Sequence, residues 1–384
     1  MIRVSRKTNK VLTSMLLIVL LGAVYLFQDF GEPMDMYLKE DVQKVRRSSA
    51  NVSSFIKCER NVEAAKSPGF SMLSVDFQNF LYYRHCRSFP IILDVPDKCG
   101  GVDEPEDVFL LLVIKSSPIN YDRREVLRKT WAKERLHKGA QIRRIFISGT
   151  SSDHWEKDRL NKLLQLEHQQ YNDILQWDFN DSFFNLTLKQ ALFFEWMANN
   201  CPHARFLLNG DDDVFANTNG MVEYLQGLQN NTGNKHLFTG HLITNAQPIR
   251  WQQSKYFVPP QVHKPNMYPP YCGGGGFLLS GHTALIINKM SQSIPLIPID
   301  DVYIGMCLDK AKLAPQSHMG VKTLGWGFPS RNIDVYHPCY MRELLLIHKF
   351  NPGRIYIMWL QVNDPNLKCG VSRPTGENET AGFI

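Results

Sequence analysis

Three consecutive carboxylates directly follow an apolar segment near the middle of this 384-residue chain. Residues 205–209 (RFLLN) are typical of a buried strand, and Asp211, Asp212 and Asp213 come after Gly210. Carboxylate oxygens are hard ligands that suit Mn²⁺ or Mg²⁺. A cation bridged to two phosphates can neutralise a departing nucleoside diphosphate. The alternative is a solvated acidic turn or a helix cap. The position after a buried strand favours the metal site, because parallel sheets bind ligands at that edge.

A second acidic pair, Asp300 and Asp301, also follows an apolar stretch and leads into a predicted helix at residues 302–312. A carboxylate placed there can take the proton from an attacking hydroxyl in a single-displacement transfer. The alternative is that one of the two residues only caps the helix.

Four glycines, Gly273, Gly274, Gly275 and Gly276, lie between an aromatic loop that ends at Tyr271 and an apolar strand. A run of glycines can be a flexible linker. These flanks instead favour a place where the backbone approaches a ligand closely. The run is not a nucleotide fingerprint, since that motif needs a strand before it and a helix after it. We expect this loop, with Asp300, to contact donor or acceptor.

His348 ends a predicted strand at residues 344–347. A neutral imidazole there can complete a metal shell, although a lone histidine is more often an ordinary core or surface residue. Lys115, Arg123 and Arg124 follow the first predicted strand, where cations can meet a diphosphate. The two arginines can equally belong to an exposed helix face.

The elements that must position these residues alternate between apolar runs and amphipathic segments. Strands are predicted at 108–114, 144–148, 174–177, 205–209, 277–280 and 344–347, and helices at 123–134, 155–169, 186–198 and 302–312. This order predicts an α/β fold in which a mostly parallel central sheet has helices on both faces.

The N-terminus predicts a membrane anchor. Four cations in the first ten residues precede an apolar run at 11–27, which is long enough to cross a thin bilayer. A cleaved signal peptide is the alternative, but no small-residue cleavage site follows. The flanking charges predict a cytoplasmic tail at 1–10 and a lumenal remainder. We assign 28–106 to a stem, 107–369 to the catalytic domain and 370–384 to a disordered tail.

Composition agrees with a lumenal enzyme and excludes a nucleic-acid-binding protein. The formal net charge is only +6, and part of it lies in the N-terminal tail. All eight cysteines follow the apolar run, which predicts disulfides in an oxidising compartment. Glycosylation sequons begin at Asn51, Asn180, Asn185, Asn230 and Asn378.

The motifs together resemble one family. The sequence contains, in this order, VFLLLVIKSSPINYDRREVLRKTW, DILQWDFNDSFFNLTLK, FLLNGDDDVFANT, YPPYCGGGGFLLS and PIDDVYIGMCL. Their order resembles the β-1,3-glycosyltransferases (glycosyltransferase family 31), over about residues 77–369. Within that family the chain is most similar to the β-1,3-N-acetylglucosaminyltransferases that extend core 1 O-glycans.

The resemblance implies a GT-A fold, type II Golgi membrane topology and Mn²⁺, with Mg²⁺ as the alternative cation. It implies an inverting transfer of N-acetylglucosamine from UDP-GlcNAc to the 3-hydroxyl of a terminal β-galactose, on O-glycans or poly-N-acetyllactosamine chains. One rival is a β-1,3-galactosyltransferase that uses UDP-galactose. A more distant rival is a non-catalytic lumenal sugar-binding protein. Whether the chain forms a homo-oligomer is left open.

The resemblance implies roles for the residues of this sequence that match the positions of the family's motifs. Asp213 matches the metal-coordinating last aspartate, with Asp211 nearby, His348 matches a metal-ligand histidine and Asp301 matches the catalytic base. The residues expected to line the donor site are Lys115, Arg123, Arg124, Asp178, Lys189, Asp211 and Asp212. Cys272 stands where relatives carry alanine, which suggests a disulfide specific to a subgroup. Asn185 lies within the NLTLK motif, so its glycosylation is expected.

Overall fold

The computed structural model describes residues 58–100, 106–229, 231–323 and 336–369. The predicted anchor at 11–27, the tail at 370–384 and the sequons at Asn51, Asn230 and Asn378 lie outside these ranges. Among the helices of the described ranges, none combines the length and apolar content that a membrane crossing needs.

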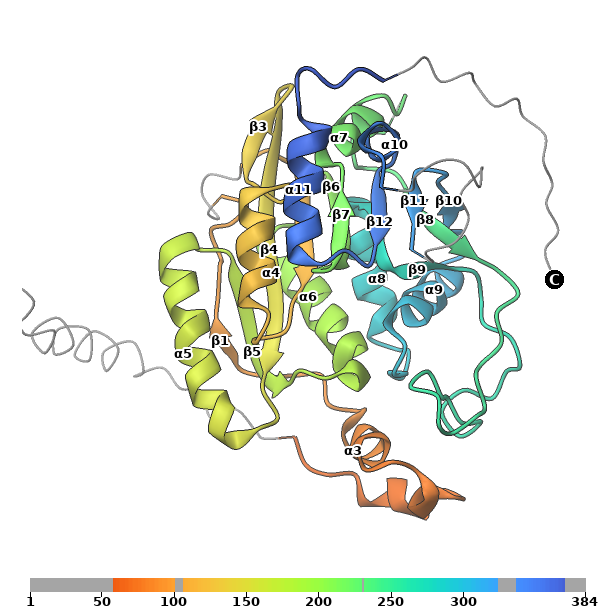
Figure 1. Cartoon of the computed structure of the whole chain (residues 1–384). Helices are drawn as coiled ribbons and strands as arrows, with labels where there is room; N and C mark the ends of the chain where they lie inside the picture. The colour runs from red at the N-terminus through yellow and green to blue at the C-terminus, as the bar shows by residue number, and fades with distance from the viewer. Residues whose placement is uncertain (1–57, 101–105, 230, 324–335, 370–384) are drawn as a thin grey trace, which may run out of the picture. The chain divides into compact units, whose positions relative to one another are not determined.

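A sheet of nine strands forms the centre of the described chain, in the order β1-β5-β4-β2-β6-β9-β8-β10, with β3 paired to β4 (Figure 1). Its strands are β1 Ile91–Leu93, β2 Val108–Lys115, β3 Arg135–His137, β4 Ala140–Thr150, β5 Ile174–Asn180, β6 Phe206–Asp211, β8 Phe238–Ile243, β9 Tyr271–Ser280 and β10 Gln316–Ser317. A second sheet in the described ranges has three strands in the order β11-β12-β7. They are β11 Val321–Lys322, β12 Leu346–His348 and β7 Val214–Ala216.

The α/β prediction is confirmed, but the sheet is mixed rather than mostly parallel. Strands β5, β4, β2 and β6 pair in parallel. Strand β9 instead lies antiparallel to both β6 and β8, and β1 and β3 are antiparallel to their neighbours. Parallel neighbours need a crossover, usually a helix. No helix forms within residues 244–270, the connection from β8 to β9, so β9 returns beside β8 in the opposite direction.

Helices cover both faces of the central sheet, as Figure 1 shows for α4 and α11 on one side and α6 on the other. The helices are α3 Val75–Tyr83, α4 Tyr121–Lys129, α5 His154–Tyr171, α6 Leu186–Asn200, α7 Thr218–Gln226, α8 Gly281–Ser291, α9 Asp300–Lys310, α10 Pro338–Glu343 and α11 Pro352–Val362, with short 3₁₀ turns η2 Val62–Lys66, η3 Phe70–Met72 and η4 Phe183–Asn185. The core between α3, α6, α8, α9 and the sheet includes Leu111 and Val113. The core under α4, α7, α10 and α11 includes Leu110 and Leu112. Strand β2 is buried along its whole length because successive side chains enter opposite cores.

The segment after residue 57 packs with the sheet. One compact unit begins at Cys58, and Phe77, Phe80 and Leu81 of α3 belong to the same core as β2 and α6. These residues fall in the part of the chain assigned to the stem. The division into stem, catalytic domain and tail stays a prediction.

Six of the eight cysteines form disulfides, as expected for a lumenal chain. The pairs are Cys58–Cys86, Cys99–Cys201 and Cys339–Cys369. The expected disulfide at Cys272 is wrong: Cys272 and Cys307 are both free and buried. Cys272 lies within β9, where its thiol approaches a backbone oxygen, that of Gln316, at 3.7 Å.

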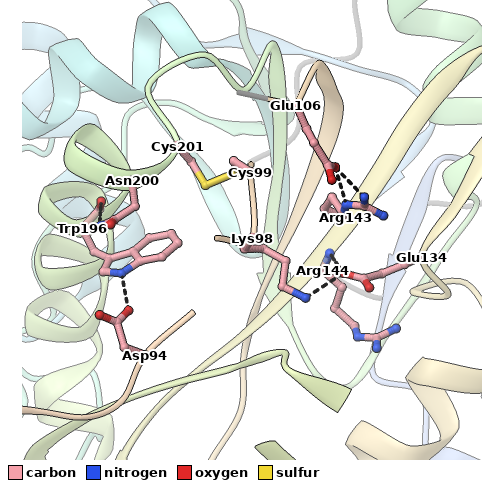
Figure 2. The surroundings of a disulfide bond; sticks show 10 residues. All are labelled: Asp94, Lys98, Cys99, Glu106, Glu134, Arg143, Arg144, Trp196, Asn200 and Cys201. Atoms are coloured by element: carbon pink, nitrogen blue, oxygen red, sulfur yellow. Dashed lines mark hydrogen bonds and ion pairs between the residues drawn. A yellow bond between two sulfur atoms is a disulfide. The ribbon is translucent and has the colours of Figure 1, made fainter. Parts of the chain in front are cut away.

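The Cys99–Cys201 bond joins the segment before β2 to the end of α6 (Figure 2). Polar contacts surround it. Lys98 pairs with Glu134 at 3.1 Å, and the Trp196 indole donates to Asp94 at 2.8 Å. The chain that enters β2 is therefore tied to both α6 and the region before β4.

Candidate active site

The carboxyl ends of β2 and β6 meet the first turn of α9 and the glycines of β9. Register brings them together, because Lys115 of β2 pairs with Asp211 of β6, and Gly210 pairs with Gly276. The chemistry predicted from separate motifs thus gathers at one edge of the sheet, where α/β sheets bind ligands.

Asp211, Asp213 and His348 offer ligand atoms that all lie within 4.8 Å of one another. The His348 Nε2 atom is 3.1 Å from Asp213 Oδ1 and 3.7 Å from Asp211 Oδ2. Strand β12 supplies the histidine, since it pairs antiparallel with β7, which directly follows the acidic cluster. Asp213 Oδ1 is buried and accepts no hydrogen bond of good geometry within the described residues. Two carboxylates and an imidazole form a donor set that fits Mn²⁺ or Mg²⁺.

The orientation of His348 suits this role. Its Nδ1 atom lies 3.2 Å from the carbonyl oxygen of Thr323, to which it can donate, so Nε2 is left to face the carboxylates. Burial acts to lower the pKa of His348, but the close contact with the Asp213 carboxylate, the charge of Asp213 and the charge of Asp211 raise it above its ordinary value. The same negative charge that holds a proton on His348 would attract a divalent cation.

Lys115 connects the cluster of Asp211, Asp213 and His348 to the second acidic pair. Its buried Nζ atom lies 2.7 Å from Asp300 Oδ2 and 3.0 Å from Asp211 Oδ1, and it donates to the carbonyl of Gly274 at 3.3 Å. Burial opposes the charge, yet the two carboxylates raise the pKa of Lys115, so the ammonium stays charged. Lys115 therefore holds α9, β6 and β9 in one arrangement.

Asp301 has the environment of a general base. The amide of Gly274 donates to its Oδ2 at 3.0 Å, and the amide of Val302 donates to its Oδ1 at 2.8 Å. Burial and then the neighbouring charge of Asp300 raise the pKa of Asp301 to about 7. A carboxyl tuned to near neutrality can accept a proton and later release it.

The four glycines lie in β9 rather than in a loop, which corrects the sequence interpretation. They allow β9 to pass close to the site residues. A Cβ atom on Gly275 would lie 2.8 Å from Cγ of His348, and one on Gly276 would lie 2.5 Å from a methyl carbon of Leu346. Tyr271 begins the same strand near Asp301, and burial followed by the Asp301 charge raises its pKa. The missing side chains of Gly275 and Gly276 thus make room for His348 and Leu346.

Asp212 contacts helix α4 and the turn before it. Arg123 NH1 lies 3.0 Å from its Oδ1, and Asn120 Nδ2 donates to its Oδ2 at 2.8 Å. The same Arg123 guanidinium lies 3.7 Å from Asp213 Oδ2 and is one-third exposed (33%). Arg123 can therefore reach an anion at the site, whereas Asp212 is buried and paired.

Sequence comparison agrees with this arrangement. The family described as "Galactosyltransferase" matches residues 122–319, a span that includes the acidic cluster and Asp301. The human N-acetyllactosaminide β-1,3-N-acetylglucosaminyltransferase 3 is 51% identical over 314 residues, which is 82% of each chain. This chain belongs to the galactosyltransferase family.

Two further relatives match most of the length of this chain. A human acetylgalactosaminyl-O-glycosyl-glycoprotein β-1,3-N-acetylglucosaminyltransferase is 46% identical, covering 81% of this chain and 80% of the relative. The mouse UDP-GlcNAc:betaGal β-1,3-N-acetylglucosaminyltransferase 7 is 42% identical, covering 82% and 78%. A solved structure of 4-diphosphocytidyl-2C-methyl-D-erythritol synthase from Anaerococcus prevotii gives a TM-score of 0.31 at 13% identity. The match covers 55% of this chain and 86% of that chain. This similarity is too low to support a conclusion about the chain.

Three residues expected at the donor site form ion pairs with residues outside the Asp211–Asp213–His348 cluster, and their role in donor binding stays a prediction. Arg124 is fully buried against Glu167 of α5. Asp178 is exposed and pairs with Lys157 at 2.6 Å, since the buried residues on either side of it in β5 point the other way. Lys189 is buried in α6 and pairs with Asp181 at 2.8 Å.

Sequence reasoning missed the polar residues that support the candidate site. Asn120 and Ser116 contact Asp212, and Asp181 accepts from the amide of Gly149 at the end of β4. Serine, asparagine and aspartate are common in turns for local reasons, so type alone did not mark these as site residues. Their position after predicted strands was the available signal.

The sequon at Asn185 lies at the start of α6. The Asn185 amide donates to the carbonyl of Asn180 at 2.8 Å, and the hydroxyl of the sequon residue Thr187 is buried and donates to the carbonyl of Ile297 at 2.6 Å. Glycosylation at Asn185 stays a prediction.

Proposed function

We propose that this chain transfers N-acetylglucosamine from UDP-GlcNAc to the 3-hydroxyl of a terminal β-galactose, with inversion at the anomeric carbon. The relatives reported above are all named β-1,3-N-acetylglucosaminyltransferases, at identities of 42–51%. Their names do not favour the rival donor UDP-galactose. The single structural observation that carries the proposal is the half-buried Asp301, which Gly274 and Lys115 connect to a cluster of two carboxylates and an imidazole.

Asp301 and Arg123 have separate roles in the proposed reaction. Asp301 accepts the proton of the acceptor 3-hydroxyl, while the Gly274 and Val302 amides stabilise its charged form. The acceptor oxygen forms a bond to the anomeric carbon from the side opposite the diphosphate, and UDP leaves with the electron pair of the broken bond. Arg123, which reaches Asp213 from the exposed side of the cluster, offers a cation to the diphosphate.

Asp211, Asp213 and His348 are the residues proposed to hold Mn²⁺, with Mg²⁺ as the alternative. The ion would supply charge neutralisation for the departing UDP. The parallel strands β5, β4, β2 and β6 and the acidic cluster at the end of β6 support assignment to the GT-A fold.

We further propose a single-pass type II protein of the Golgi membrane with a lumenal catalytic domain. The basic tail and the apolar run at 11–27 support the anchor, and the three disulfides support an oxidising compartment.

The test uses purified full-length protein with Mn²⁺ and either UDP-GlcNAc or UDP-galactose. The acceptor panel contains a core 1 O-glycan, a lactosamine chain and an N-acetylgalactosaminyl peptide, the last because one relative is named for an acetylgalactosaminyl acceptor. We expect GlcNAc linked β-1,3 to the galactose-terminated acceptors, and no product from Asp301→Asn. Transfer of galactose alone, product only on the N-acetylgalactosaminyl peptide, or an active Asp301→Asn enzyme would contradict the proposal.

A further inference from the structure

The guanidinium of Arg124 uses all three of its nitrogen atoms to join helix α5 to the turn at residues 116–120. Its Nε and NH2 atoms donate to the two carboxylate oxygens of Glu167 at 2.9 and 2.7 Å. The remaining contacts go to the turn between β2 and α4: NH1 donates to Ser116 Oγ at 3.0 Å and to the Ser117 carbonyl at 2.7 Å, and NH2 donates to the Pro118 carbonyl at 3.1 Å. The side chain is fully buried, so this arginine is inaccessible to substrate.

The turn that Arg124 holds, residues 116–120, is the turn that holds Asp212. Asn120 at its end donates to Asp212 Oδ2 at 2.8 Å, and the Ser116 hydroxyl at its start hydrogen-bonds to the same carboxylate. A continuous series of polar contacts therefore runs from Glu167 through Arg124 and Ser116 to Asp212.

Asp212 lies between the two carboxylates of the metal cluster. Burying a carboxylate is costly unless it is hydrogen-bonded, and the 116–120 turn supplies most of the donors that Asp212 uses. If the turn shifted, Asp212 would turn toward water and rotate the backbone that carries Asp211 and Asp213. The distance of 3.1 Å between Asp213 and His348 depends on that backbone.

We propose that Arg124 is a positioning residue for the acidic cluster, held by Glu167 and acting through the 116–120 turn on Asp212. Lysine cannot replace it, because only the planar guanidinium fork can bond both carboxylate oxygens of Glu167 and three groups of the turn at once. The inference rests on the proposed function in one respect: it takes Mn²⁺ and UDP as the ligands of the cluster.

The chain offers a matched control in the same buried network. Arg144 of β4 bonds Asp173 and the Ala132 carbonyl, each at 2.8 Å, and is similarly buried. Asp173 also pairs with Arg128, which bonds Glu167. Arg144 contacts no residue of the 116–120 turn among the contacts of the described chain. Arg144→Lys thus damages the network to a comparable degree without touching the turn.

The experiment compares full-length wild type, Arg124→Lys, Glu167→Gln and Arg144→Lys. Calorimetric titration of Mn²⁺ in the presence of UDP gives the affinity of the cluster. Thermal melting without ligand gives the stability of each protein, and hydrogen exchange of peptides covering residues 116–124 and 211–214 gives their local order. We expect Arg124→Lys and Glu167→Gln to bind Mn²⁺–UDP about 10- to 100-fold more weakly, the range typical of contacts that orient metal ligands. Both peptides should exchange faster, while Arg144→Lys matches wild type in affinity and in exchange.

The inference is overturned if Arg124→Lys binds and exchanges like wild type, or if Arg144→Lys loses affinity to the same extent at an equal fall in melting temperature. Failure of the proposed function gives a different result, in which wild type itself binds no UDP with Mn²⁺. Exchange at residues 116–124 and 211–214 still decides whether Arg124 positions the cluster in that case.

Discussion

Asp301 is the residue whose protonation should control the rate. Because burial raises its pKa to about 7, it is mostly protonated below that pH and cannot accept a proton from the acceptor. About one carboxyl in ten is ionised one pH unit below the pKa. We therefore predict that kcat/KM for the acceptor rises as pH increases through about 7 and then levels off, measured with saturating Mn²⁺.

A second titration must be separated from that of Asp301. Protons also compete with the metal for His348, so each point of the profile needs its own Mn²⁺ titration. A profile that is flat from pH 5.5 to 8.5 would contradict the role of Asp301 as base.

His348 and Asp213 give the second prediction, which concerns binding rather than rate. His348→Ala removes one of the three ligand atoms, so the two remaining carboxylates hold a cation with fewer bonds and more weakly. We expect at least about 10-fold weaker Mn²⁺-dependent UDP binding by calorimetry, and more for Asp213→Asn. Exposed His282 provides the control, since His282→Ala removes an imidazole far from any carboxylate of the cluster. A chelator should abolish UDP binding by wild type, and renewed Mn²⁺ should restore it.

The limits of sequence reasoning are clearest at two adjacent arginines. Arg123 and Arg124 are neighbours in the first turn of α4, and successive residues in a helix point about 100° apart. Only one of them can face the site. Their types are identical, so nothing in the sequence told which one lies beside Asp212 and Asp213 and which is buried against Glu167. Asp211 and Asp213 were easier to predict, because α/β sheets bind ligands at the carboxyl ends of their parallel strands. Asp301 lies in the first turn of helix α9 and His348 ends a strand of the second sheet, so the family resemblance was the stronger signal for these two residues.

At the scale of elements, the glycine run of β9 is the feature most misread from sequence. Glycine has low strand propensity, and four in succession are typical of a loop. The pairing of β9 with β6 and β8 outweighs this preference. The close approach of β12 explains why glycine is needed in β9: a side chain at Gly275 or Gly276 would occupy the space of His348 and Leu346. Such contacts between elements distant in sequence leave no local pattern.

The third prediction follows from that close approach. Gly275→Ala places a Cβ atom 2.8 Å from Cγ of His348, so β12 must move and the ligand histidine with it. Overpacking of this kind costs about 1–3 kcal/mol, and we expect a lower melting temperature together with weaker Mn²⁺–UDP binding. Gly274→Ala is the neighbouring control, because its Cβ atom would lie 3.4 Å from Asp301 Oδ2, an ordinary contact. Equal effects of the two substitutions would show that space beside His348 is not the reason for the glycine.

At the scale of the whole molecule, the fold can be tested by which cysteines are paired and which are free. Disulfides were predicted from compartment and number, but pairing depends on which segments meet in space. We predict two free thiols, Cys272 and Cys307, which alkylating reagents modify only after denaturation because both are buried. Peptide mapping of the denatured, unreduced protein should find the label on these two residues alone. Labelling of the native protein, or label at any other cysteine, would contradict the arrangement.

The Cys99–Cys201 bond should contribute most among the three disulfides to stability. It closes a separation of 102 residues, against 28 and 30 for the others. In the chain-entropy account, a closed loop of that size stabilises the folded state by about 4.7 kcal/mol, and shorter loops contribute less. We predict that Cys99→Ser/Cys201→Ser lowers the free energy of unfolding by about 2–5 kcal/mol, measured by denaturant titration.

The bond also joins two segments that lead to the candidate site. It fixes the chain at the entrance to β2, the strand that ends at Lys115, and at the end of α6, whose Lys189 pairs with Asp181 at the same edge of the sheet. Cys339→Ser/Cys369→Ser is the matched control, since it removes a disulfide that closes a short loop near α10. If the control destabilises the protein as much as the Cys99/Cys201 variant, loop length does not set the contribution, and the strain or packing around each bond must decide it instead.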